Sequence, residues 1–229
     1  ENSKILYILP LTCIFLIPTL HRTIMPERFV EHYGGGTWFK AAFLHTFTFL
    51  ALSFLLVNPP FGDIAAPELA KSWTVVAHDG EEIEYPFDVS TKGTTLTWHT
   101  NGSTTLQGDA WLLFGLMDNK NSDGASVEVT REYQANVTTR EVNASFWYDN
   151  QEAIKNGTSS SNESSPNLTP HGDQDQPFAI FLGTDLGEGI HKITVVITED
   201  GDPWENVQTY NWTLEVINVS PFDQDSISE

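Results

Sequence analysis

The chain has 229 residues, a formal net charge of −20 and a sequence pI of about 4.4. Residues 1–60 are near neutral, whereas residues 61–229 hold 28 Asp and Glu against 7 Lys and Arg. Such an acidic surface repels phosphate backbones and argues against nucleic acid as a partner. The single cysteine, Cys13, leaves the acidic part without a disulfide framework or a thiolate metal site. A secreted domain of this kind is typical of archaeal or bacterial surfaces.

Two uncharged apolar runs, residues 5–20 and 41–57, open the sequence. A membrane-spanning helix needs about 20 residues, with a lower limit near 17. The runs therefore predict a two-helix transmembrane hairpin over residues 1–60. Two other interpretations stay open, namely a pair of buried core helices and the apolar part of a signal peptide.

The loop between these runs, residues 21–40, carries Arg22, Arg28 and Lys40, while Lys4 is the one cation near the start. The positive-inside rule then places this loop in the cytoplasm and both the amino end and the acidic part outside. We expect a short interfacial helix over 26–33 and a flexible glycine run at 34–36. Residue 1 is not methionine, which is consistent with an upstream segment, such as a cleaved signal peptide.

The second apolar run also contains polar side chains. His45, Thr48 and Ser53 fall roughly on one face of the predicted helix. Polar groups in membrane helices usually face protein rather than lipid. We interpret these residues as a contact with the first helix or with another subunit, and a proton or metal site at His45 is the alternative.

The acidic part shows strand-like patterns. Residues 61–80 are expected to be a linker and the entry to this domain, and residues 222–229 form an acidic tail. Between them, over 81–221, short runs rich in β-branched and aromatic residues alternate with Gly-, Asn- and Asp-rich turns. One such run extends over 126–148, and no helix is expected. This pattern predicts an extracellular all-β domain, an antiparallel sandwich with a long loop at 152–176.

The end of the domain carries a family resemblance. Leu186, Gly189 and His191 form a turn that leads into the strand Ile193-Thr194-Val195, and a closing strand follows at 210–219. This stretch, about 186–219, resembles the last two strands of immunoglobulin-like domains of the PKD type on prokaryotic surfaces. The resemblance implies a β-sandwich that acts as a spacer or a contact module.

Asn-X-Ser/Thr triplets, the acceptors of N-linked glycans, are frequent in the acidic part. Chance would give two or three in a chain of this composition, yet eight are present, all after residue 100 and so on the side predicted to be external. The sequence therefore predicts a glycoprotein with glycans at Asn101, Asn136, Asn143, Asn156, Asn162, Asn167, Asn211 and Asn218.

Candidate metal ligands are few. Asn119, Asn121 and Asp123 alternate before Gly124 in the manner of a calcium loop, but Thr130 stands where such a loop has its bidentate Glu. We expect no cofactor beyond a weakly bound divalent cation. The sequence has no GxSxG, HExxH, P-loop or dinucleotide fingerprint, and we expect no enzymatic activity.

Three functions follow from this layout. The first is a membrane-anchored, N-glycosylated accessory subunit of a membrane protein complex. The second is a surface module that binds a cation, a glycan or an envelope layer. A sugar platform would need exposed rings among the candidates Trp98, Trp111, Trp147, Tyr148 and Trp204. The third rests on a resemblance of layout to subunit II of haem–copper oxidases. Without cysteine in the acidic part this would be a version lacking the dinuclear copper site.

Overall fold

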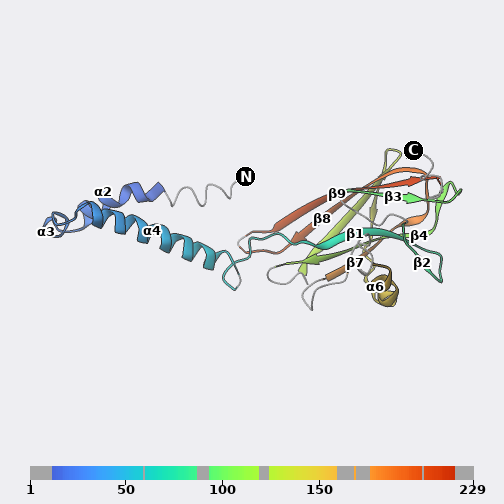
Figure 1. Ribbon diagram of the computed structural model, residues 1–229, viewed down its shortest axis with the longest axis horizontal. Coiled ribbons are helices and arrows are strands. Elements are labelled where there is room, and N and C mark those ends of the chain that lie inside the picture. Colours follow the sequence, from blue (N-terminus) through green and yellow to red (C-terminus); the bar gives the residue numbers. More distant parts are fainter. Residues whose placement is uncertain are drawn as a thin grey trace, which may run out of the picture. The chain divides into compact units, whose positions relative to one another are not determined.

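The computed structural model describes residues 12–58, 60–86, 93–118, 124–158, 168, 176–202 and 204–219. The chain divides into two compact units, Glu1–Asp63 and Ile64–Glu229. Figure 1 shows that helices make up the first unit and that β-strands dominate the second.

The first unit contains the 3₁₀ turn η1 (Cys13–Leu16) and helices α2 (Ile17–Ile24), α3 (Glu27–Val30) and α4 (Gly35–Leu56). Among the described residues, α4 is the one helix long and apolar enough to cross a membrane. The apolar helix at Ile14–Ile24 is shorter than a span. One N-terminal apolar helix is therefore present, a membrane anchor or a signal sequence by length and composition. Residues 5–11 of the first apolar run lie outside the described residues.

Helix α4 begins earlier than predicted and includes two of the glycines expected to be flexible. Gly34 is extended (φ −91°, ψ 177°), and its carbonyl accepts hydrogen bonds from the backbone nitrogens of Thr37 and Trp38. The interfacial helix expected over 26–33 is only one turn, α3. Rings of His21, Tyr33 and Trp38 pack together, with centroids 5.3–6.0 Å apart, and join α2 to the start of α4.

The second unit is a sandwich of two sheets. The four-stranded sheet has the order β2 (Ile83–Glu84), β1 (Glu68–His78), β4 (Thr105–Met117) and β7 (Gln176–Gly187), all antiparallel. The segment 61–80, which we expected to hold a linker and the entry to this domain, thus contains the full strand β1. Its Trp73, Val75, Val76 and Ala77 are buried.

The five-stranded sheet has the order β3 (Thr95–His99), β9 (Asn206–Ile217), β8 (Gly189–Glu199), β5 (Ser126–Tyr133) and β6 (Asn136–Arg140). Three of its ladders are antiparallel, but β3 pairs with β9 in parallel. The prediction of a wholly antiparallel sandwich is therefore wrong at this ladder. Parallel pairing is possible because more than 100 residues separate the two strands, far more than a hairpin.

The core between the sheets centres on stacked tryptophans. The ring of Trp73 in β1 lies 4.7 Å from that of Trp212 in β9, and the two planes are 7° apart. Phe114 of β4 meets Trp212 edge-on at 5.5 Å. Such aromatic pairs add to the free energy gained by burying their area. This cluster joins both sheets through fully covered side chains.

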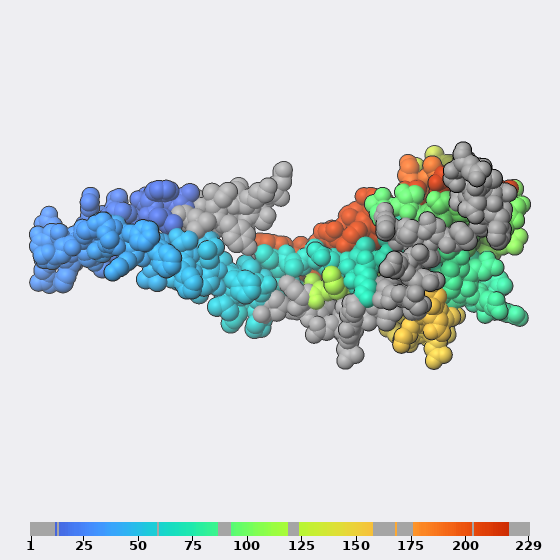
Figure 2. All heavy atoms as spheres, in the orientation of Figure 1, coloured from blue at the N-terminus to red at the C-terminus, as the bar shows by residue number. Residues whose placement is uncertain are grey.

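A second apolar layer covers the outer face of the four-stranded sheet. Helices α5 (Ala144–Asp149) and α6 (Gln151–Thr158) place Phe146, Trp147 and Ile154 over Val76, Leu113 and other side chains of that face. Figure 2 shows α6 at the surface beside the strands of this sheet. The prediction of strand structure over 126–148 is thus wrong for the residues after Arg140. Asn143 caps α5 by accepting a hydrogen bond from the Ser145 nitrogen (3.1 Å).

The corner between β7 and β8 passes the chain from one sheet to the other. Tyr133 stacks on His191 at 4.2 Å, and its hydroxyl donates to the Glu188 carbonyl (2.9 Å). A Cβ at Gly187 would lie 2.7 Å from that hydroxyl, so the close approach requires glycine. The hairpin β8–β9 follows, as the sequence predicted. The structure thus shows a β-sandwich, which is the general part of the family resemblance.

Replacing Trp212 with alanine removes the central ring of the core. We expect a loss of about 3–5 kcal/mol in unfolding free energy, because the cavity lies between two sheets. Urea unfolding followed by circular dichroism measures this loss. Trp204, which is 45% exposed, provides the control, and Trp204→Ala should change the free energy by no more than about 0.5 kcal/mol. Equal effects of the two changes would contradict the assignment of the core.

Candidate functional site

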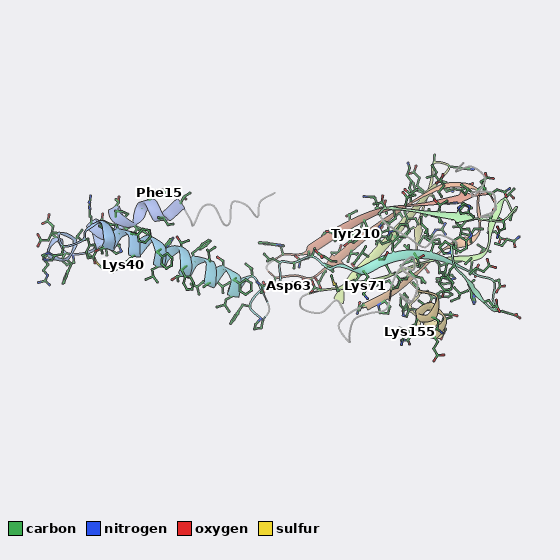
Figure 3. The ribbon with its side chains drawn as sticks, in the orientation of Figure 1. Phe15, Lys40, Asp63, Lys71, Lys155 and Tyr210 are labelled. Carbon is green, nitrogen blue, oxygen red and sulfur yellow. The ribbon has the colours of Figure 1, made fainter. Side chains whose placement is uncertain are left out.

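The surface of α4 is the first candidate. No residue of this helix is buried, and large apolar side chains are exposed along its length, as the sticks in Figure 3 illustrate. They include Phe39, Phe43, Leu44, Phe47, Leu50, Phe54 and Leu55. In water such a surface would be strongly unfavourable, since each exposed Phe or Leu forgoes roughly 1.5–3 kcal/mol of burial energy. Such an exposed apolar surface is that of a membrane anchor or of a signal sequence.

The predicted polar face of α4 is only partly assembled. His45 and Ser53 are partly covered, and so are Thr46 and Phe49 between them. Thr48 is exposed and lies outside this partly covered strip. The Thr46 hydroxyl donates to the Ala42 carbonyl within the helix (2.9 Å). The structure thus groups His45 with Ser53 and separates Thr48 from them.

The second candidate is the set of glycan acceptors. Six of the eight predicted asparagines lie in the described residues, and all six are exposed, namely Asn101, Asn136, Asn143, Asn156, Asn211 and Asn218. Asn162 and Asn167 lie outside the described residues. An acceptor must lie at the surface, and all six of these residues do.

Turn geometry explains how two of these asparagines reach the surface. Asn101 (φ 49°) and Gly102 (φ 94°) form the left-handed turn between β3 and β4. Asn136 follows Gln134 and Ala135, which have φ of 49° and 63° in the hairpin between β5 and β6. Asn is one of the few residues that adopt the left-handed region readily. The first acceptor is therefore part of the turn itself.

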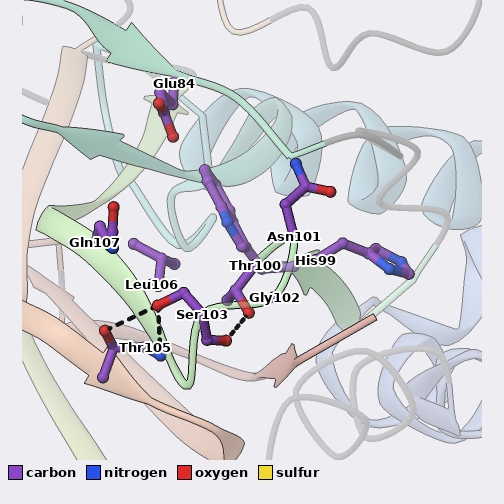
Figure 4. Close-up of a pocket in the computed structure, with 10 residues that line it drawn as sticks. Glu84, His99, Thr100, Asn101, Gly102, Ser103, Thr105, Leu106 and Gln107 are labelled. Atoms are coloured by element: carbon purple, nitrogen blue, oxygen red, sulfur yellow. Dashed lines mark hydrogen bonds between the residues drawn. The ribbon is translucent and has the colours of Figure 1, made fainter. Parts of the chain in front are cut away.

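Figure 4 shows the cavity beside Asn101. It has a volume of about 480 Å³, and its lining is mostly polar, with Glu84, His99 and Gln107 around the turn. The Thr105 nitrogen donates to the Ser103 hydroxyl (3.2 Å). The Thr100 hydroxyl donates to the Ser103 carbonyl, which fixes the turn. The cavity wall combines hydroxyl and amide groups with one carboxylate and one imidazole.

Two further acceptors use their amide oxygen in a hydrogen bond. Asn143 accepts from the Ser145 nitrogen and hydroxyl, and Asn211 accepts from the Thr194 hydroxyl at 3.1 Å. In both side chains the nitrogen, the atom that carries a glycan, points away from that bond. These asparagines are thus held in fixed orientations at the surface.

The structure also groups two arginines that sequence analysis did not single out. Arg131 in β5 and Arg140 in β6 are the only arginines after residue 60. The register pairs Val129 with Arg140 and Arg131 with Thr138, so both side chains share the inward face of this hairpin. Hairpin register is the signal that could have revealed them, because side chains two residues apart share a face.

Arg140 lines a cavity of about 530 Å³, together with Asp109, Glu141 and Phe181 among others. Burial lowers the pKa of both guanidinium groups, and the Arg140 charge lowers the pKa of Arg131 further. Among the described residues, neither arginine forms an ion pair. Both guanidinium groups are thus partly sheltered from solvent, and the carboxylates of Asp109 and Glu141 line the cavity next to Arg140.

Two predictions concern the calcium-like loop and the aromatic side chains considered for a sugar platform. Asn119, Asn121 and Asp123 lie outside the described residues. Elsewhere in the β unit, carboxylate oxygens of Asp118 and Glu199 lie within 4.8 Å of each other and could contribute to holding a hard cation. Of the aromatic candidates, Tyr148 and Trp204 are exposed at 62% and 45%, whereas Trp98, Trp111 and Trp147 are buried.

Comparisons with known proteins leave the family open. No family model matches the chain, and no curated protein matches it. Among solved structures, AggA, the major subunit of aggregative adherence fimbriae type I from Escherichia coli, is 10% identical. The alignment covers 68% of this chain and 97% of AggA, with a TM-score of 0.30. That score is too low to support a conclusion about fold or function.

The buried imidazole of His191 makes stability depend on pH. Its Nε2 donates to the Gly187 carbonyl (2.8 Å). Burial lowers the pKa of His191 below 6.5, the nearby Arg131 charge lowers it further, and the hydrogen bond acts in the opposite direction. The unfolded chain then binds more protons than the folded chain just below pH 6.5. Unfolding free energy should therefore fall as pH drops below this value.

Urea titrations between pH 5.5 and 7.5 measure this dependence. The wild type should lose stability towards pH 5.5, and His191→Gln should show a smaller loss over the same interval. Comparing the two proteins at each pH cancels the titration of other groups. Parallel pH profiles would show that His191 does not titrate in this manner.

Proposed function

We propose that this chain is a membrane-anchored, N-glycosylated cell-surface protein and a non-catalytic accessory subunit of a membrane protein complex. The observation that carries the proposal is the apolar helix α4, which has no buried residue and is followed by a β-sandwich with six exposed acceptor asparagines. The sandwich, of the PKD-type immunoglobulin-like group, would shield the partner or contact another surface protein.

The orientation in this proposal follows from charge. Arg22, Arg28 and Lys40 lie between the two apolar runs, and the strongly acidic β unit follows the second. With the loop 21–40 in the cytoplasm, the first apolar run forms the other helix of the hairpin. The partly covered His45 and Ser53 support a contact with the first helix or with a partner subunit, because polar groups in lipid need protein partners.

Cysteine labelling tests the orientation. In a Cys13→Ser background, His32→Cys and Glu128→Cys place single thiols at exposed positions of the two units. A membrane-impermeant maleimide should label the thiol at 128 in intact cells. It should label the thiol at 32 only after the membrane is permeabilised. Labelling at 32 in intact cells would contradict the cytoplasmic loop.

Co-purification in mild detergent tests the accessory role. We expect stoichiometric recovery of a partner with the wild-type chain. The double change His45→Leu and Ser53→Leu should reduce recovery several-fold, because polar contacts between membrane helices contribute about 0.6–2 kcal/mol each. Thr48→Leu is the matched control, since Thr48 lies outside the partly covered strip, and it should retain the partner. Purification of the wild type alone would contradict the subunit role.

One observation favours a second candidate function, a surface binding module. The cavity beside Arg140 combines this cation with the carboxylates of Asp109 and Glu141 and the half-buried ring of Phe181, a set of polar groups and one ring that suits a sugar. Isothermal titration with glucuronic acid and with glucose compares the charged and the neutral sugar. Binding of neither would remove this candidate.

A further inference from the structure

The two sheets differ in how their outer faces are covered. Helices α5 and α6 bury the outer face of the four-stranded sheet. On the outer face of the five-stranded sheet no described side chain is buried, including those of its central strands at Thr194, Val196, Thr209 and Thr213. Among the described residues no helix or loop covers this face.

This open face is neither strongly charged nor fully polar. Val137, Ile190 and Val207 belong to it by register and are 61%, 56% and 54% exposed. The Lys192–Glu132 pair (3.4 Å) crosses its centre. A shallow depression of about 320 Å³ lies there, with threonine hydroxyls and Val137 along its wall. In a chain of net charge −20, such a face is suited to a neutral, hydroxyl-rich covering.

Asn211 lies within this depression. Alternation along β9 buries Trp212 (3% exposed) and directs Asn211 and Thr213 outward, so both essential residues of the acceptor triplet share the open face. The bond from Thr194 holds the amide oxygen towards β8 and leaves the amide nitrogen directed away from that strand. Asn101, Asn136, Asn143, Asn156 and Asn218 instead occupy turns, strand ends or helices.

We propose that Asn211 carries an N-linked glycan whose first sugars lie in this depression and cover the outer face of the five-stranded sheet. The glycan would cover the outer face of this sheet, as α5 and α6 cover the outer face of the four-stranded sheet. The inference rests on the proposed function, since it requires the β unit to meet a glycosylation system. It adds the location and the structural role of one glycan.

The chemistry is a group transfer without oxidation or reduction. The Asn211 side-chain nitrogen attacks the anomeric carbon of a sugar carried on an isoprenoid phosphate or diphosphate. A carbon–nitrogen bond forms, the bond between that carbon and the phosphate oxygen breaks, and the phosphate leaves with the electron pair. One amide proton is released. Once attached, the sugar can accept hydrogen bonds from threonine hydroxyls and lay its apolar side against Val137.

Four variants of the full chain, produced in a glycosylating host, test the proposal. Asn211→Gln and Thr213→Ala each destroy the acceptor triplet, whereas Thr213→Ser preserves it. Asn136→Gln removes an acceptor at the hairpin edge and is the control for losing any single glycan. Glycopeptide mass spectrometry reports occupancy at each asparagine.

The second measurement is the acylation rate of Lys192, which lines the depression. We expect Asn211→Gln and Thr213→Ala to raise this rate several-fold, and Thr213→Ser and Asn136→Gln to leave it at the wild-type value. Lys71 and Lys155, which are exposed elsewhere on the β unit (Figure 3), should react at unchanged rates in every variant.

The outcomes separate the two proposals. Glycans at Asn101 or Asn136 with a bare Asn211 would overturn this inference and leave the proposed glycoprotein intact. Bare asparagines throughout would overturn both. Occupancy at Asn211 with an unchanged Lys192 rate would show a glycan that projects away from the sheet, which also overturns the covering role.

Discussion

The stack of Trp73 on Trp212 is the contact on which the β unit depends. It joins β1 of the four-stranded sheet to β9 of the five-stranded sheet, and Phe114 of β4 packs edge-on against Trp212. Because strand side chains alternate, an inward Trp212 forces Asn211 and Thr213 outward, and a slip of one residue would reverse all three. Core packing therefore determines the presentation of this acceptor, and the surface chemistry of β9 follows from its buried face.

The same alternation explains why the two outer faces need different coverings. Val76, Trp111 and Leu113 make the outer face of the four-stranded sheet apolar, so a helical layer with Phe146 and Ile154 must cover it. The outer face of the five-stranded sheet carries threonines instead, whose methyl groups suit a strand and whose hydroxyls tolerate water. That face can remain open to solvent, or to sugars, without a helix.

Strong alternation made part of the fold predictable. The hairpin of β8 and β9 followed from the turn residues between two strand-like runs and from the family resemblance over 186–219. The prediction of a strand over 144–148 was wrong. Phe146, Trp147 and Tyr148 have high strand propensity, yet they lie in helix α5, where the Phe146 ring stacks on Trp111 with centroids 4.0 Å apart. Strand β1 lies in the segment where we expect a linker and the entry to the domain. Its central run is buried on both faces and therefore lacks the alternation that marks a strand. Tertiary packing overrode local preference in both segments.

The candidate sites also differ in whether the local sequence is enough to predict them. Acceptor triplets are local, so the sequence reveals every one of them, and exposure of Asn211 follows once Trp212 is known to be buried. Contacts between distant positions are not local. The strip on α4 contains His45 and Ser53 but not Thr48, because the direction from which a helix is covered is absent from its own sequence. Likewise, Arg131 and Arg140 become neighbours only through the register of their hairpin.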